Sequence, residues 1–310
     1  MPGIKPGFED KAYWNQKASE YSAYGIRAEG FEETNDIWDY FKYCLQTGNR
    51  FFFDNPLLPL ITHLFERYTF VLEKGTTVYR ARIDQKKELS DQCWLAKDYA
   101  DLQLTDPESP FAEFYKSRAE SIANNPEFQE FKIRYIQGFE GFDAKDSGLP
   151  PFDKVSAGRC NPEHVPLLYI ASDIHTATAE VRPFIRDSIS IAELNVVKDL
   201  RLVDFHFEYN EDGYREIDNI FFDKIRQEFS AVNKGEKEKY LTTQYITALI
   251  KQQGFDGIRF KSSLVEQGAN YVIFDAENCS VVSSKMYILR KVEYDLFEML
   301  SDYEKDLLKD

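Results

Sequence analysis

Hydrophobic residues recur with the spacing of α-helices over residues 1–75 of the chain. The pattern predicts helices over residues 8–24 and 34–47, the second capped at Thr34-Asn35-Asp36. Pro56 opens a third helix, which should end near residue 75. Its inward stripe would be Leu60, Leu64, Phe65, Tyr68 and Leu72. We therefore expect a small helical extension that serves for packing or for interaction.

The period of the pattern changes to two between Thr76 and Ile83, which predicts a β-strand. Arg80 and Arg82 fall on one face of this strand, together with Val78. Two arginines on one face are unusual for a core strand, so the face is either solvated or part of an anion site. The strand by itself favours the solvated face.

Residues 84–150 are polar and acidic and contain several prolines. They predict two helices, near 109–122 and 126–136, within an insertion on the surface of a larger domain. A lid over a site and a peripheral elaboration both fit this composition, and the second is the more common role.

The stretch from Ala157 to Pro183 predicts a loop, a strand and a helix in that order. Gly158 begins a turn, residues 167–171 form an apolar run, and Ser172-Asp173 is an N-cap signal. The helix should continue to about residue 181, before the proline. This unit would bring together three residues of different chemistry: Arg159 in the loop, Tyr169 in the strand and Glu180 on the helix.

The rest of the chain alternates strands with helices. Strand patterns cover residues 188–197, 200–205, 257–260, 270–274 and part of 280–290, with Lys198-Asp199 expected as a hairpin turn. Helical patterns cover residues 214–230, 237–253 and the charged tail, 293–310. Since G-x-G-x-x-G follows no strand, a parallel dinucleotide-binding sheet is not supported. We expect an α+β fold with a mixed or antiparallel sheet over residues 76–292.

Composition narrows the range of functions. The 310 residues carry a formal net charge of −15, so a broad basic surface for nucleic acid is not expected. The four cysteines lie far apart in the sequence, which predicts buried thiols in a reducing compartment rather than a metal site. The chain has no apolar leader and no apolar run of membrane-spanning length. We expect a cytoplasmic protein that binds neither metal, nucleic acid nor membrane, with an oligomer left open.

Three blocks of the chain carry polar residues within short motifs. They are Y-R-A-R at residues 79–82, G-R-C-N-P-E-H-V-P-L-L-Y-I-A-S-D-I-H-T-A-T-A-E-V-R-P at 158–183, and Y-L-T-T-Q-Y-I-T-A-L-I-K-Q-Q-G-F-D-G-I-R-F-K-S-S at 240–263, followed by G-A-N-Y-V-I-F-D at 268–275. In this order they resemble the motifs of RES-domain proteins, which are named for Arg, Glu and Ser. The resemblance covers roughly residues 75–290, except 84–150, and the helical extension resembles that of longer members.

The resemblance implies a fold similar to ADP-ribosyltransferases, consumption of NAD as a substrate, and toxin activity in bacterial toxin–antitoxin modules, with an antitoxin as a possible partner. It also implies site residues. The expected catalytic residues are Glu180, Arg159 and Tyr169, and the expected substrate-binding residues are Arg80, Arg82, Ser262, Ser263, Gln244 and Asn270.

The chemistry of NAD cleavage agrees with these residue types. Breaking the nicotinamide–ribose bond develops positive charge on the ribose, which a carboxylate such as Glu180 stabilises. Arginine binds phosphate oxygens in pairs, and an aromatic ring such as Tyr169 supports nicotinamide. Each residue also fits an ordinary structural role as the alternative. In that interpretation Arg159 satisfies loop carbonyls, Tyr169 fills the core, and Gln244 or Asn270 holds a loop.

Several alternatives stay open at this point. The favoured hypothesis is that the protein is an NAD glycohydrolase or phosphorylase. The alternatives are a protein ADP-ribosyltransferase and a noncatalytic interaction module. Arg159 and His164 have the R-x4-H spacing of HEPN-type RNases, but Pro162 disfavours the helix that such a motif needs. Neither H-E-x-x-H nor G-x-S-x-G occurs in the chain.

Overall fold

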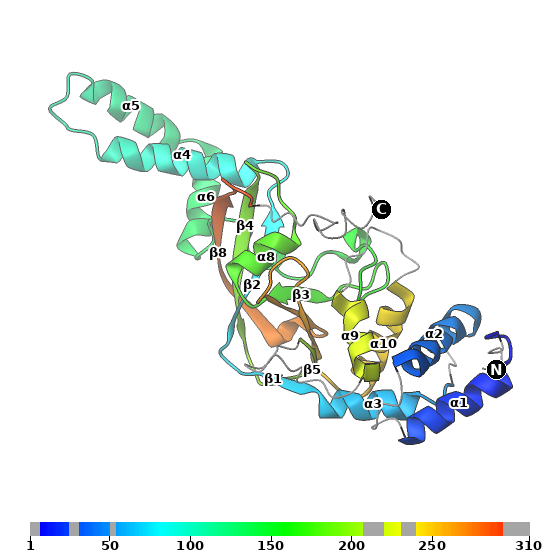
Figure 1. Cartoon of the computed structure of the whole chain (residues 1–310). Coiled ribbons are helices and arrows are strands. Elements are labelled where there is room, and N and C mark those ends of the chain that lie inside the picture. Colours follow the sequence, from blue (N-terminus) through cyan, green and yellow to red (C-terminus); the bar gives the residue numbers. More distant parts are fainter. Residues whose placement is uncertain (1–6, 25–30, 50–53, 207–219, 231–239, 294–310) are drawn as a thin grey trace, which may run out of the picture.

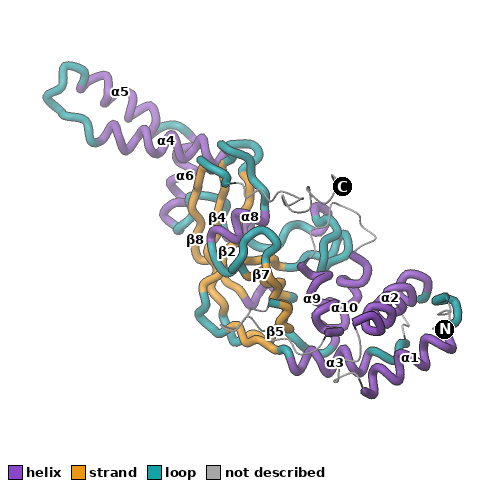
Figure 2. The backbone as a smooth tube through the Cα atoms, in the orientation of Figure 1, coloured by secondary structure: helices purple, strands orange, loops and turns teal. Residues whose placement is uncertain are grey.

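The computed structural model describes residues 7–24, 31–49, 54–206, 220–230 and 240–293. Its helices are α1 (Lys11–Tyr24), α2 (Phe31–Thr47), α3 (Leu58–Arg67), α4 (Glu88–Gln103), α5 (Ala112–Ala123), α6 (Pro126–Ile136), α7 (Ala144–Ser147), α8 (Ile174–Glu180), α9 (Ile220–Ser230) and α10 (Leu241–Gln252). Its strands are β1 (Thr69–Leu72), β2 (Thr77–Ile83), β3 (Leu168–Ala171), β4 (Ser188–Val196), β5 (Leu200–Phe205), β6 (Gly257–Lys261), β7 (Ala269–Ile273) and β8 (Cys279–Ile288). The strands gather in the middle of the molecule, between helices at its two ends (Figures 1 and 2).

The strands form one sheet in the order β1-β5-β6-β7-β3-β2-β4-β8. Neighbouring strands are antiparallel except β5 and β6, which run parallel with Leu202 opposite Gly257. The expected α+β class with a mixed, largely antiparallel sheet is therefore confirmed. The pairing is shortest between β2 and β3, where Tyr79 is opposite Ala171. Both residues of this junction line the cleft described below.

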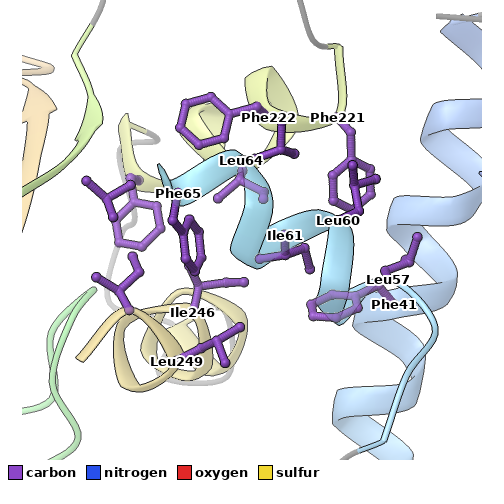
Figure 3. Close-up of a cluster of buried hydrophobic side chains, with 14 of the residues drawn as sticks. Phe41, Leu57, Leu60, Ile61, Leu64, Phe65, Phe221, Phe222, Ile246 and Leu249 are labelled. Carbon is purple, nitrogen blue, oxygen red and sulfur yellow. The ribbon is translucent and has the colours of Figure 1, made fainter. Parts of the chain in front are cut away.

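The N-terminal helices share a hydrophobic core with helices from the other end of the chain. Leu60, Ile61, Leu64 and Phe65 of α3 are buried and face α9 and α10 (Figure 3). Positions one turn apart form this stripe, and burying each large apolar side chain stabilises the fold by about 1.5–3 kcal/mol. The extension therefore packs onto the half of the molecule that contains the candidate site, while the predicted domain boundaries stay a prediction.

Three expectations about the extension are wrong. The third helix ends at Arg67 rather than near Gly75, because the aromatic and β-branched residues that follow form β1 and pair with β5. Leu72, expected on the helical stripe, is buried in that strand. Helix α2 begins at Phe31, so the predicted cap at Thr34-Asn35-Asp36 lies inside the helix.

The insertion contains the two predicted helices, α5 and α6, and also α4, which the pattern did not predict. Asn125 caps α6, its Oδ1 accepting from the Glu127 amide at 2.7 Å. The pattern missed α4 because its buried side chains include the polar Ser90 and Gln92 rather than an apolar stripe. Helices α4 and α5 extend away from the sheet as a projecting arm (Figure 1).

The remaining strands lie where the patterns predicted them, but the expected β4–β5 hairpin is wrong. Strand β4 pairs with β2 and β8, whereas β5 pairs with β1 and β6. Asp199 instead accepts from the Lys74 amide at 2.8 Å, so the expected turn is tied to the connection between β1 and β2. The predicted helices over 214–230 and 237–253 are seen as α9 and α10, and Gly254 ends α10 with φ +81°. Residues 214–219, 237–239 and 294–310 lie outside the described residues.

Within the described ranges, none of the helices combines the length and the apolar character needed to cross a membrane.

Candidate functional site

Helix α8 is short and well capped, and Glu180 is its last residue. The Asp173 carboxylate accepts from the Thr176 amide at 2.8 Å and from the Thr176 hydroxyl at 2.6 Å, and the Ser172 hydroxyl also donates to it. Burial raises the pKa of Asp173, but these hydrogen bonds outweigh it, so the pKa lies below its ordinary value. The charged cap fixes the start of the helix that carries Glu180.

Two buried polar side chains hold the Glu180 carboxylate. Its Oε1 accepts from the Ser262 hydroxyl at 2.8 Å and from the Asn270 amide nitrogen at 2.6 Å. Ser262 follows β6 and Asn270 lies on β7, which pair with each other. Glu180 itself is exposed at the surface of the cleft, and the described part of the chain supplies no donor for its Oε2. One carboxylate oxygen is thus fixed, and the other is open to a ligand.

The loop before β3 is held from two sides. The Tyr169 hydroxyl donates to Asn161 Oδ1 at 2.8 Å and accepts from the Cys160 amide at 3.2 Å. Gln244 of α10 donates to the carbonyls of Gly158 and Asn161, both at 2.9 Å. A Cβ at Gly158 would lie 2.8 Å from Asn161 Oδ1 and 3.1 Å from the Tyr169 hydroxyl, so a side chain there would break this arrangement. These contacts leave little freedom to the loop that carries Arg159.

Arg159 lies half-buried at the end of α9. Its Nη1 donates to the Phe229 carbonyl at 2.7 Å, and its Cζ is 5.9 Å from the centroid of the Phe260 ring. A carbonyl in the last turn of a helix is a favourable partner for a guanidinium, because that end of the helix is partly negative.

The neighbouring groups are neutral. Burial, with Cys160 nearby, raises the pKa of Tyr169 well above its ordinary value. Burial likewise raises the pKa of the Cys160 thiol to about 12, which excludes a thiolate nucleophile there at neutral pH.

Arg80 and Arg82 do not lie on a solvated face, which the strand by itself favoured. Arg80 donates to the carbonyls of Ser147, at 3.0 Å, and Gly148, and Arg82 donates to the Gly148 carbonyl at 2.9 Å. Burial, and then the charge of Arg82, lower the pKa of Arg80 to about 9, so it remains a cation at pH 7. Both arginines clamp the end of α7.

A cleft of about 450 Å³ opens beside the junction of β2 and β3. Its charged lining consists of three cations and one carboxylate: Arg80, Lys154, Arg159 and Glu180. Tyr169 and Asn270 line it as well, together with the Phe260 ring. The cleft is therefore locally positive although the whole chain carries −15.

The other expected site residues lie behind or beside this cleft. Ser262 supports Glu180, and Gln244 supports the Arg159 loop. Arg82 lines a neighbouring cavity of about 1090 Å³. Ser263 follows Ser262 in the chain and is not among the described residues that line the cleft.

Some residues of the site were missed in the sequence. Asn161 anchors the Tyr169 hydroxyl, and Lys154 adds a cation to the cleft. The signal that could have found Asn161 is its place in the motif G-R-C-N-P, two residues after Arg159.

Two other kinds of site find no support here. Arg159 and His164 are in a loop, and His164 has φ +66°, so the R-x4-H spacing does not lie on a helix. The described residues contain no group of three or more His, Cys, Asp or Glu side chains arranged to hold a metal ion.

Comparison with known proteins assigns the family. A model of the RES domain matches residues 134–296, more than half of the chain. The chain therefore belongs to the RES domain family. No curated protein matches the chain. Among solved structures, the crystal structure of the M. tuberculosis MbcT–MbcA toxin–antitoxin complex is similar with 9% sequence identity and a TM-score of 0.35, over 74% of this chain and 92% of that chain.

Proposed function

We propose that this protein cleaves the bond between nicotinamide and ribose in NAD, with water or phosphate as the acceptor. One observation carries the proposal: Glu180 Oε1 is fixed by Ser262 and Asn270, and Glu180 lines a cleft whose lining also includes Arg159 and Tyr169. Membership of the RES domain family adds to it, because the motifs that define the resemblance supply these residues.

The proposed reaction requires stabilisation of positive charge. Nicotinamide leaves with the electron pair of the C1′–N bond, and the ribose becomes oxocarbenium-like. The Glu180 carboxylate stabilises that charge or orients a ribose hydroxyl, and its two donors keep it in place without reorganisation. Water then bonds to C1′ and releases a proton, which yields ADP-ribose, or phosphate bonds there and yields the phosphorylated sugar.

The rest of the cleft suits the remaining parts of NAD. Arg159 and Lys154 are cations at the cleft, suited to the pyrophosphate, while Arg80 contributes charge from its clamped position. The Tyr169 ring provides an aromatic surface for nicotinamide. A volume of about 450 Å³ lies within the usual range for small-molecule sites, roughly 300–1,000 Å³.

The family resemblance also supports a biological role. We propose that the activity is that of a bacterial toxin, which depletes NAD unless a cognate antitoxin protein binds the enzyme. The antitoxin is a protein partner whose removal should release the activity.

Glu180→Gln tests the proposal most selectively. The substitution keeps the size and hydrogen-bonding capacity of the side chain and removes its charge, so the protein should fold and bind NAD. Nicotinamide release should fall by about 10²–10³, the usual cost of losing a preorganised electrostatic contact. Glu163→Gln is the matched control, because Glu163 is the other acid of the same stretch and is exposed. Nicotinamide release at the wild-type rate from Glu180→Gln would show that another group does the chemistry.

A further inference from the structure

The N-terminal helix α2 is joined to the Arg159 site through the end of α9. Phe229 supplies the carbonyl that binds Arg159 Nη1, and the preceding residue, Glu228, faces α2. The Glu228 Oε1 accepts from Trp38 Nε1 at 3.2 Å and lies 3.5 Å from Lys42 Nζ. Two consecutive residues of α9 therefore make these contacts: Phe229 contacts Arg159, and Glu228 contacts α2.

The contact between α2 and α9, called the α2–α9 seam below, consists of closely packed aromatic rings. Trp38 is buried, stacks on Phe41 at 5.5 Å between ring centroids, and meets the Phe221 ring edge-on at 5.5 Å. Phe229 is also buried and stacks on Phe205 at 4.5 Å. Such packing gives a side chain few alternative positions, so the place of the Phe229 carbonyl follows from the place of α9.

The ion pair between Lys42 and Glu228 at this seam is half-buried. The Lys42 and Glu228 side chains are 30% and 29% exposed, and Lys42 also pairs with Asp39 at 2.9 Å. A half-buried carboxylate that accepts a hydrogen bond from an indole and also pairs with an ammonium group is held more firmly than a surface ion pair.

We infer that Glu228 is a positioning residue for Arg159, and that helix α2 sets the geometry of the anion-binding arginine through it. The inference rests on the proposed function, in which Arg159 binds the pyrophosphate. It gives the N-terminal helices a defined role, because α2 lies outside the residues that match the RES domain model. Helix α2 supports the site from a second direction as well, since Phe41 meets Tyr245 of α10 edge-on at 6.3 Å, next to Gln244.

A double-mutant cycle tests the inference. Glu228→Ala should raise the KM for NAD on the order of tenfold and leave kcat nearly unchanged, because Arg159 contacts NAD equally before and during bond cleavage. In an Arg159→Ala background the same substitution should have no further effect on KM. Equal effects of Glu228→Ala in both backgrounds, or no effect in either, would overturn the inference.

Two further variants guard against a trivial result. Trp38→Phe keeps an aromatic ring but removes the Nε1 donor to Glu228 together with part of the buried indole. It should raise KM by a smaller factor even if Glu228→Ala does not fold. Its effect should also vanish in the Arg159→Ala background, and an effect that persists there contradicts the inference. Glu66→Ala breaks the exposed pair between Glu66 and Arg201, 2.7 Å apart, and should leave KM unchanged.

A readout without NAD separates this inference from the proposed function. The guanidinium signals of Arg159, assigned by Arg159→Lys in nitrogen-15 spectra, should show a hydrogen-bonded, slowly exchanging Nη–H in the wild type. Glu228→Ala should speed that exchange and shift the signal, and an unchanged signal would refute the positioning role. Failure of the wild type to cleave NAD would instead refute the proposed function and leave this measurement intact.

Discussion

Asn270→Ala should impair the proposed catalytic role of Glu180 while leaving the Glu180 side chain in the protein. The only side-chain contact recorded for Asn270 among the described residues is its bond to Glu180 Oε1, at 2.6 Å, and Asn270 is 6% exposed. Ser262 would then hold the same oxygen alone. A hydrogen bond to a charged group is worth about 1.5–3 kcal/mol. If that positioning is lost in the transition state, kcat should fall roughly 10- to 100-fold, since about 1.4 kcal/mol corresponds to a factor of ten.

The assay is nicotinamide release at saturating NAD, with the KM and the melting temperature measured on the same preparations. The KM should change little, because the proposed role of Glu180 is to stabilise charge that develops during the reaction. Asn195→Ala is the matched control: Asn195 lies on β4 and bonds to Thr77 Oγ1 at 3.3 Å, outside the cleft lining. Equal kcat values for the two variants would refute the view that Asn270 positions Glu180. A rise in KM alone would show that Asn270 binds the substrate directly.

Two other substitutions examine the supports of the site. Tyr169→Phe keeps the ring but removes the hydroxyl that joins Asn161 and the Cys160 amide. Losing these hydrogen bonds should weaken NAD binding by about 1 kcal/mol, so we expect a roughly five- to tenfold rise in the KM for NAD and a much smaller loss of kcat than in Glu180→Gln. Unchanged kinetics would mean that the loop keeps its shape without the hydroxyl. Asp173→Ala should lower the free energy of unfolding by about 0.5–2 kcal/mol at pH 7 through loss of the cap of α8. Because the pKa of Asp173 is lowered in the fold, its contribution is present above the ordinary value of 3.8 and is lost as the pH falls through the folded pKa, so urea unfolding of wild type and variant should converge in acid. A difference that persists undiminished in acid would show that the stabilisation does not come from the charged carboxylate.

Local patterns predicted the site unit well because its signals are short-range. The cap at Asp173, the apolar run of β3 and the proline after α8 lie within a few residues of the structures they determine. The spacing of Arg80 and Arg82 placed both on one face, and both reach the same carbonyl of Gly148. Their burial could not be read from β2, because the group that covers them is the end of α7, more than sixty residues away.

Long-range pairing was not predictable in the same way. Adjacent strands β4 and β5 suggested a hairpin, yet each pairs with strands that are distant in sequence. The roles of Gln244 and Asn270 were left between substrate and loop for the same reason. The structure places Gln244 against loop carbonyls and Asn270 against Glu180, which are contacts between residues 83 and 90 positions apart.

The most direct test of the central claim is incubation of the purified protein with NAD, with and without phosphate, followed by identification of all products. We expect free nicotinamide together with ADP-ribose, or with its phosphorylated form when phosphate is the acceptor. If nicotinamide is released only when a second protein is added, and that protein becomes labelled with ADP-ribose, the reaction is ADP-ribosyl transfer rather than hydrolysis. If no acceptor gives any nicotinamide from NAD, the cleft at Glu180 is not a site of NAD cleavage, and the protein is a noncatalytic interaction module.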